Sequence, residues 1–216
     1  MSIDAGSMTR AERKRAEQAA QLRAEIVDAA FAEFAAVGYH ATTIADIARR
    51  LSVSPGTVYN YFKNKRDIVD HVVSRLEAQL RAALVGDNAP GTARTLAEFR
   101  AQTMRIATAV DALFYADERM ARVLLFEVTA IDATMTERVL AMFDAAHQIS
   151  FESLTDGARR GFLRDDVDIG ATADVIVGVM ISASVRNLRN SYPAADRQAW
   201  REAAVGVLIE GIAARG

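Results

Sequence analysis

Polar groups that can bind a polyanion are concentrated between Ser54 and Lys65. Gly56 in this stretch permits a close approach of the backbone to a ligand. Val58 and Phe62 stand four residues apart, so both are expected to face inward from one side of a helix. The other positions offer hydroxyl, amide and amine groups: Thr57, Tyr59, Asn60, Tyr61, Lys63 and Lys65. Such groups fix a protein on phosphates and read base edges, so the segment favours nucleic-acid binding.

Two short helices joined by a tight turn are predicted to position these groups. Apolar residues at helical spacing predict the first one: Ile44, Ile47, Ala48 and Leu51. Thr43 is its expected N-cap, with Asp46 at the third helical position. The second helix begins after Ser54, with Pro55 at the first helical position, where its missing N–H costs nothing. Two helices around a turn at 51–53 can place the second in the major groove of DNA.

Residues 38–68 also carry a family-specific pattern. They fit the signature T-T-hydrophobic-x-x-I-A-x-x-x-x-V-S-x-G-T-hydrophobic-Y-x-[HY]-F-x-x-K. The matching positions are Thr42, Thr43, Ile44, Ile47, Ala48, Val53, Ser54, Gly56, Thr57, Val58, Tyr59, Tyr61, Phe62 and Lys65. The segment therefore resembles the DNA-binding head of the TetR/AcrR family of bacterial transcription regulators. Beyond it, the chain resembles the family in length, helix number and paired C-terminal helices.

The resemblance implies a role for each matching residue. It gives Thr43 a phosphate contact at the start of the first short helix. The residues that approach bases are Ser54, Pro55, Gly56 and Asn60. The residues that grip the sugar-phosphate backbone are Thr57, Tyr59, Tyr61 and Lys65. Ser52 departs from the family, which often has Gly there, and predicts a strained or altered turn. Arg66 stands where the family often has an acidic residue, and it adds positive charge beside the phosphates. Pro55 offers no donor, so DNA shape is expected to contribute to recognition.

Charge is divided unevenly along a chain whose formal net charge is −2. Residues 8–66 hold ten Lys or Arg against six Asp or Glu, while residues 67–216 hold sixteen against twenty-one. A basic head on an acidic body is expected when only one end meets phosphates. Four basic residues precede the first predicted helix and form either an arm that reaches a minor groove or a solvated tail: Arg10, Arg13, Lys14 and Arg15.

Helix signals dominate the chain, so we predict an all-α fold of about nine helices: a three-helix helix-turn-helix head joined to a helical ligand-binding and dimerisation body. The expected domains are a disordered basic arm at 1–15, the DNA-binding head at 16–63 and the body at 64–216. The predicted helices outside the motif cover residues 16–37, 64–84, 92–115, 117–131, 134–160, 170–190 and 194–214. The sequence G-D-N-A-P-G at 86–91 is the clearest break.

The last two predicted helices carry the candidate dimer interface. Helix 170–190 is apolar nearly all round, and a helix of that kind must be covered on more than one side. Helix 194–214 has a cleaner apolar stripe with small residues: Trp200, Ala203, Ala204, Val207, Leu208, Gly211 and Ile212. These helices suit packing against the same pair of a second copy; burial in one monomeric core is the alternative.

The resemblance implies a ligand cavity among the central helices. Candidate lining residues are aromatic side chains and polar residues that stand within apolar stripes: Phe99, Thr103, Phe126, Phe143 and His147. Such a set predicts a mostly apolar effector. Ordinary core is the alternative for each of them, with Thr103 bonded to its own helix backbone.

The sequence contains no pattern of residues that is typical of a catalytic or metal site. Cysteine is absent, and the three histidines, His40, His71 and His147, lack metal-ligand spacing. The acidic run at 165–168 lacks the Gly and distal Glu of a calcium loop. Nucleotide-binding and hydrolase motifs are missing too. We expect neither enzyme activity nor a cofactor or metal.

The sequence therefore predicts a cytoplasmic homodimer without a membrane partner. It is expected to bind double-stranded DNA at a near-palindromic operator and to act as a repressor that a small, mostly apolar effector releases. A regulator or architectural DNA-binding protein without an effector is the main alternative, and an enzyme with a vestigial head is a third.

Overall fold

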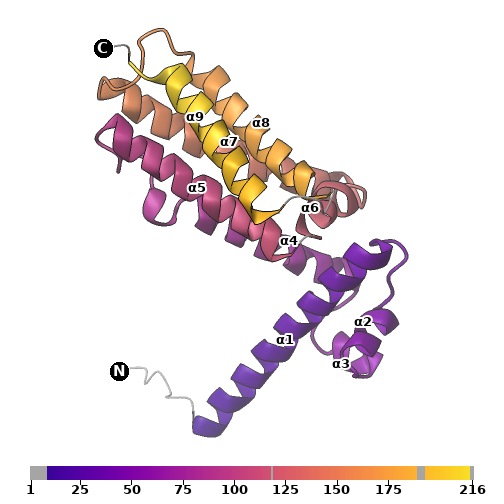
Figure 1. Cartoon of the computed structure of the whole chain (residues 1–216). Coiled ribbons are helices and arrows are strands. Elements are labelled where there is room, and N and C mark those ends of the chain that lie inside the picture. The colour runs from indigo at the N-terminus through magenta and orange to yellow at the C-terminus, as the bar shows by residue number, and fades with distance from the viewer. Residues whose placement is uncertain (1–8, 118, 189–192, 215–216) are drawn as a thin grey trace. The chain divides into compact units, whose positions relative to one another are not determined.

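The computed structural model describes residues 9–117, 119–188 and 193–214, and within these ranges the fold is helical throughout (Figure 1). The helices are α1 (Arg10–Val37), α2 (Ile44–Arg50), α3 (Pro55–Tyr59), α4 (Lys65–Leu84), α5 (Leu96–Ala116), α6 (Met120–Arg122), α7 (Ala133–Arg159), α8 (Ile169–Asn187) and α9 (Ala194–Ile212). A 3-10 helix covers Gly86–Asn88, and a π-helix covers Val123–Val128. The predicted all-α fold with a helix-turn-helix head is confirmed.

The chain forms two compact units, Met1–Val73 and Ser74–Gly216. Helix α4 belongs to both, because its first nine residues fall in the first unit and the rest in the second. The sequence analysis places the functional boundary before this helix, at residues 63/64. That functional boundary stays a prediction, since compactness alone does not test it.

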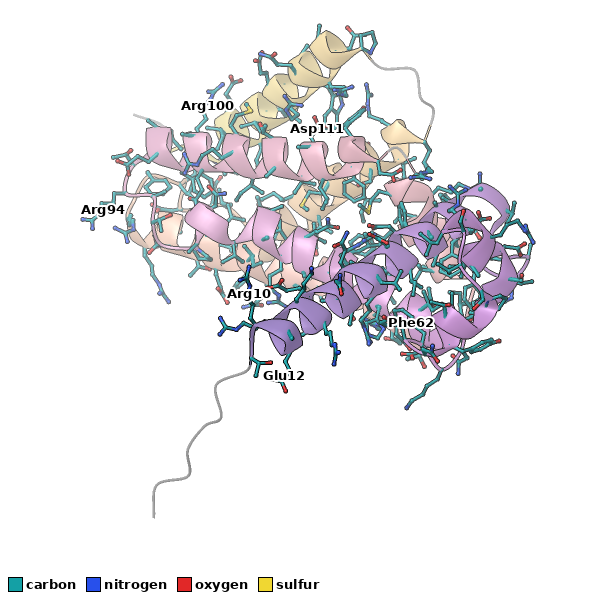
Figure 2. The ribbon with its side chains drawn as sticks, turned by 90° about the horizontal axis from the view of Figure 1, so that it is seen from below. Arg10, Glu12, Phe62, Arg94, Arg100 and Asp111 are labelled. Atoms are coloured by element: carbon teal, nitrogen blue, oxygen red, sulfur yellow. The ribbon has the colours of Figure 1, made fainter. Side chains whose placement is uncertain are left out.

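The first unit is held together by apolar side chains from all four of its helices. The largest completely buried members are Phe34 and Ile26 of α1, Ile47 of α2, Val58 of α3, Phe62, and Ile68 of α4. Burying a side chain of this size contributes roughly 1.5–3 kcal/mol. Phe62 lies just after α3, inside the head (Figure 2). The inward orientation predicted for Val58 and Phe62 is confirmed.

Helix α1 begins six residues earlier than expected. Thr9 accepts a hydrogen bond from the Glu12 backbone N–H, and the Glu12 carboxylate accepts one from the Thr9 N–H. This reciprocal cap satisfies two backbone donors at the helix start, so the polar sequence that follows remains helical (Figure 2). The basic residues from Arg10 to Arg15 are therefore helical and exposed, not a disordered arm. The rest of the predicted arm, residues 1–8, lies outside the described residues.

Side-chain caps set several of the other helix starts. The Asn64 side chain accepts from the Asp67 N–H at the start of α4, and Asp168 accepts from the Ala171 N–H at the start of α8. Helix α5 begins at Leu96, later than the predicted Thr92, because Thr95 is its cap. In place of one helix at 117–131, the chain has α6 and a π-helix. Asp117 binds both the backbone and the side chain of Arg119, which forms a turn before α6.

The second unit is a bundle in which α5, α7, α8 and α9 run side by side (Figure 1). Helix α7 packs against α8, and α5 packs against both α8 and α9. One apolar cluster joins α5, α7, α8 and α9 around Phe99, Leu154, Ala173 and Ile209. The end of α9 is tied back by backbone hydrogen bonds, from the Arg164 N–H to the Ile212 oxygen at 2.9 Å and from the Ala214 N–H to the Phe162 oxygen at 3.1 Å.

Candidate DNA-binding surface and ligand cavity

Helices α2 and α3 are each fixed by a cap at the N-terminus. The Thr43 hydroxyl accepts from the Asp46 N–H at 3.2 Å, and the Asp46 carboxylate accepts from the Thr43 N–H at 2.9 Å. These hydrogen bonds from the side chain and backbone of Thr43 lower the pKa of Asp46. At α3, the Ser54 hydroxyl accepts from the Thr57 N–H at 3.1 Å, and Pro55 occupies the first turn. Both predicted caps are confirmed.

The turn between α2 and α3 contains a strained residue. Ser52 has a φ of 56°, in the left-handed region, and is the one non-glycine residue within the described ranges with a positive φ. Such a conformation costs an L-residue about 1–2 kcal/mol relative to its usual wells. The altered turn backbone expected at this position is present.

Most of the residues predicted to meet DNA lie on one exposed side of α3 and its flanks. Tyr59 is 55% exposed although it carries a large ring. The other exposed members are Thr43, Ser54, Pro55, Gly56 and Asn60, and the half-buried members are Thr57, Tyr61 and Lys65. Because Val58 and Phe62 occupy the buried side, the polar groups face away from the core. Their roles in DNA binding stay predictions.

Gly56 can be tested without disturbing the fold. A Cβ built at this position would have the Ser54 Oγ as its nearest neighbour, at 3.6 Å, which is an ordinary van der Waals contact. The fold of the free protein therefore does not require glycine here. A need for glycine would come from a bound partner that approaches the backbone closely.

Lys65 has a role that the sequence pattern did not reveal. Its Nζ donates to the backbone oxygens of Tyr39 at 2.6 Å, His40 at 3.2 Å and Thr42 at 2.7 Å. The same amine lies 4.3 Å from the centroid of the Tyr39 ring. Burial lowers the pKa of the Lys65 amine, whereas the surrounding oxygens favour its charged form. Lys65 thus ties the start of α4 to the loop before α2, and an ammonium has only three hydrogens to donate.

A second cluster ties α1 to α4. The Arg23 Nη2 lies 2.6 Å from the His71 Nε2, and the His71 Nδ1 lies 2.8 Å from the backbone oxygen of Asp67. The rings of Phe62 and His71 meet edge to face, and the Arg23 guanidinium covers the Phe62 ring. His71 is therefore part of the packing of the head.

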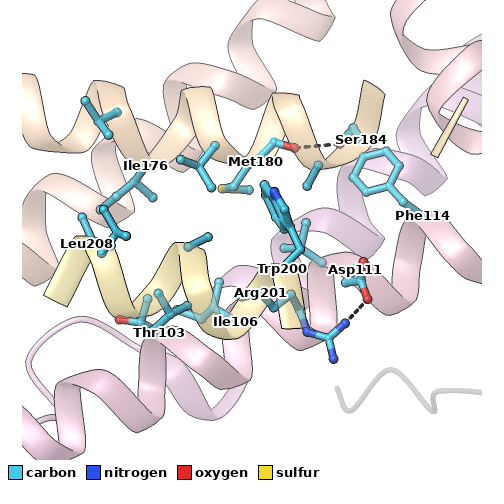
Figure 3. Close-up of a pocket in the computed structure, with 18 residues that line it drawn as sticks. Thr103, Ile106, Asp111, Phe114, Ile176, Met180, Ser184, Trp200, Arg201 and Leu208 are labelled. Atoms are coloured by element: carbon cyan, nitrogen blue, oxygen red, sulfur yellow. Dashed lines mark hydrogen bonds and ion pairs between the residues drawn. The ribbon is translucent and has the colours of Figure 1, made fainter. Parts of the chain in front are cut away.

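The second unit contains a cavity of about 160 Å³ between α5, α8 and α9 (Figure 3). Its walls are mainly apolar and include Ile106, Val110, Phe114, Ile176, Met180 and Leu208. The Arg201 Nη1 forms an ion pair with the Asp111 Oδ2 at its edge, and each of these side chains is only 16% exposed. Trp200, the only tryptophan of the chain, also lines the cavity. An apolar cavity with a few polar groups is typical of a small-molecule site.

The five predicted ligand residues are not brought together in this cavity. Thr103 lines it, and its hydroxyl donates to the Phe99 oxygen of its own helix at 2.9 Å. Phe99 is buried in the apolar cluster, and Phe126 is exposed on the π-helix. Phe143 and His147 lie on α7, where the His147 Nε2 is 3.4 Å from the Asp174 carboxylate. The assignment of these five residues to a ligand stays a prediction.

The lining residues that sequence reasoning missed belong mostly to α8 and α9. Trp200 and Ala204 were assigned to a dimer stripe, and Arg201 was not considered. A charged residue beside the only tryptophan, within an otherwise apolar stripe, was a usable signal. Its ion-pair partner Asp111 stands 90 residues earlier and could not be paired with it from the sequence.

Helices α8 and α9 present an apolar face that the single chain leaves uncovered. Val207 is 74% exposed and Val175 58% exposed, and Val179 and Val185 are exposed as well. The stretch Ile169–Arg186 is long and apolar enough to cross a membrane by length and composition, yet only 17% of it is buried within the described part of the chain. Val175, Val179 and Val207 also line the cavity, so the cavity borders this face.

Comparisons with known proteins agree with the geometry of the head. The model of bacterial regulatory proteins of the tetR family matches residues 26–72. The fatty acid metabolism regulator protein of Bacillus subtilis (strain 168) is 24% identical over 156 residues, covering 72% of this chain and 78% of that protein. The HTH-type transcriptional regulator BetI of Klebsiella pneumoniae (strain 342) is 38% identical over 63 residues, so the chain matches only 32% of its length.

A solved structure extends the likeness to the body. The transcriptional regulator FadR from Bacillus subtilis, in complex with stearoyl-CoA, superposes with a TM-score of 0.71 at 23% identity, covering 87% of this chain and 98% of that one. Together, the helix-turn-helix head and the helical body define a DNA-binding transcription regulator. Residues 26–72 match the model of the TetR family of bacterial regulatory proteins, and this match supports membership of that family.

Proposed function

We propose that this regulator is a cytoplasmic homodimeric repressor that a small, mostly apolar molecule releases from a near-palindromic operator. The observation that carries the proposal is the apolar cavity between α5, α8 and α9, in the same chain as the DNA-binding head. The likeness to a structure that holds stearoyl-CoA supports an effector with a large apolar part.

Helix α4 is the proposed connection between ligand and DNA. Its first half contributes Ile68, Val69 and Val72 to the core of the head, and its second half contributes Leu80 and Leu84 to the body. A ligand that fits one orientation of this helix better would change the distance between the α3 helices of the two copies in the proposed dimer. Couplings of about 1–3 kcal/mol change operator affinity by roughly 5–150-fold.

The exposed apolar face of α8 and α9 is the proposed dimer interface. A second copy would remove Val175, Val179 and Val207 from water, and each fully buried valine contributes about 1.5 kcal/mol or more. Val207→Glu is expected to yield monomers with much weaker operator binding, because it places a charge in this face. Sedimentation velocity checks this, with Arg159→Glu on the exposed end of α7 as the control. If the Val207→Glu protein sedimented as a dimer like the wild type, this result would contradict the proposed interface.

Effector-dependent release tests the function itself. Operator affinity is measured by fluorescence anisotropy with and without candidate effectors, and effector affinity is measured with and without operator. The factor by which the effector lowers operator affinity must equal the factor by which the operator lowers effector affinity, because the coupling is reciprocal. An effector that binds free and DNA-bound protein equally well would contradict the proposal and favour a regulator without a ligand switch.

A further inference from the structure

The cavity between α5, α8 and α9 is closed on one side and open on the other. Val110 and Phe114 of α5 and Val205 of α9 form its floor, and each of these side chains is at most 7% exposed. Its rim differs, because Val175 of α8 and Val207 of α9 line the cavity and are more than half exposed. The cavity therefore opens onto the apolar face of α8 and α9, the two helices that lie on either side of it (Figure 3).

A single chain cannot remove an apolar ligand in this cavity from water. Val179 of α8 also lines the cavity and is exposed, one turn after Val175, so the opening extends along α8. The free energy gained when an apolar molecule binds is roughly proportional to the apolar area that leaves water. A ligand in the open cavity keeps its outer side in water, and the affinity that this side could contribute is lost.

A second copy of the chain is the cover that fits this opening. The stretch Ile169–Arg186 of α8 has a mean hydropathy of 1.5, yet only 17% of it is buried within the described part of the chain. The rim of the cavity belongs to the same face as the proposed dimer interface, and regulators of the TetR family function as dimers. Because a two-fold interface uses the same patch on both copies, each copy would lie over the cavity of the other.

We propose that the ligand site is complete only in the dimer, in which the α8 and α9 face of each copy closes the cavity of the other. The inference rests on the proposed effector function and the proposed interface, and it adds a form of regulation. Coupling between two binding events is reciprocal, so a ligand that prefers the closed site also raises the association constant of the dimer. The protein would then leave its operator as a ligand-bound dimer and not as separate monomers.

Benzene is a suitable probe of this coupling. The cavity measures about 160 Å³, and an engineered apolar cavity of about 150 Å³ binds benzene. Covering about 60 Å² more of the benzene surface corresponds to a gain in affinity of about ten-fold. Since the dimer has two sites, saturating benzene is expected to raise its association constant by the square of this gain, about 100-fold. Sedimentation velocity of the full-length protein, labelled on its α-amino group and studied at nanomolar concentration, measures this constant with and without benzene.

Val185→Glu provides a monomer for direct comparison. Val185 is exposed on α8 and does not line the cavity, so the added charge should disrupt the interface and leave the cavity walls unchanged. On titration calorimetry, Val185→Glu is expected to bind benzene at least ten-fold more weakly than the wild-type dimer. Leu140→Glu is the matched control, because Leu140 is exposed on α7 outside this face. It should change neither the dimer nor the affinity for benzene.

A cavity-filling variant assigns the probe to this site. Ala204 lines the cavity, and Ala204→Leu should abolish both the binding of benzene and its effect on the dimer. Benzene binding that survives in this variant would place the probe elsewhere and overturn the inference.

Four further outcomes would overturn it. They are absence of benzene binding to the wild type, equal affinity of the Val185→Glu monomer and the wild-type dimer for benzene, a wild-type dimer that benzene leaves unchanged or weakens, and a Val185→Glu protein that remains a dimer. The measurement on wild-type association decides even if Val185→Glu does not fold.

Failure of the proposed function looks different. If benzene and the second copy strengthen each other's binding but no ligand of the cavity changes operator affinity, the coupling stands and the release mechanism fails. If an effector releases the protein from its operator yet binds monomer and dimer equally tightly, the release mechanism stands and this inference fails.

Discussion

Replacing Lys65 by methionine decides between two roles for this residue: a tie within the head, which its hydrogen bonds indicate, and a contact with DNA phosphate, which the family resemblance implies. The substitution keeps most of the aliphatic stem and removes three hydrogen bonds to backbone oxygens. A bond from a charged donor contributes about 1.5–3 kcal/mol. The bonds to Tyr39 and Thr42 are short and partly buried, whereas water can replace the longer one to His40. Because the side chain is partly exposed, we take the lower value for the two short bonds, which gives a loss of about 3 kcal/mol.

Urea unfolding followed by circular dichroism measures this loss. Lys63→Met is the matched control, because Lys63 is an exposed lysine two residues earlier, and its change is expected to stay within about 0.5 kcal/mol. The salt dependence of operator binding tests the second role. A lost phosphate contact would lower the slope of log affinity against log salt by about 0.9. We expect Lys65→Met to leave this slope unchanged, since the amine already donates all its hydrogens. Unchanged stability together with a lower slope would refute the reasoning.

Three further changes probe the head. Gly56→Ala should keep or slightly raise the free energy of unfolding, because its Cβ meets nothing closer than 3.6 Å, yet weaken operator binding at least ten-fold; wild-type affinity would mean that DNA does not approach this backbone. Ser52→Gly should raise the free energy of unfolding by roughly 0.5–1 kcal/mol, because glycine adopts a positive φ without strain; a lower midpoint in urea would argue against strain. The pKa of Asp46 is lowered in the folded head, so its contribution to stability is present above its unfolded pKa and is lost as pH falls through the folded value. Unfolding midpoints measured from pH 6 to pH 2 should therefore fall more in wild type than in Asp46→Asn, and parallel curves would contradict the cap.

The parts of the fold that could be predicted are those that depend on residues close together in the sequence. The caps at Thr43, Ser54 and Asn64 need only a few neighbouring residues, and the structure has helices beginning directly after each. The early start of α1 was also readable from Thr9 and Glu12 but lay in a polar stretch without an apolar stripe.

The parts that could not be predicted depend on residues far apart in the chain. The Lys65 amine binds oxygens more than twenty positions earlier, and only the folded loop brings them together. The cavity likewise joins α5 to α8 and α9, so Thr103 could be suspected from its stripe whereas the pairing of Arg201 with Asp111 could not. The π-helix at Val123–Val128 has no local signal in the sequence.

Selection of DNA from a random pool by the full-length protein tests the central claim most directly. A homodimer with two helix-turn-helix heads is predicted to enrich one near-palindromic sequence whose half-sites are separated by about one helical turn, ~34 Å, or a multiple of it. The enriched site should lose affinity for the Gly56→Ala and Val207→Glu proteins. Recovery of no sequence above the random pool, or of single half-sites without symmetry, would contradict the account of a dimeric operator-binding regulator.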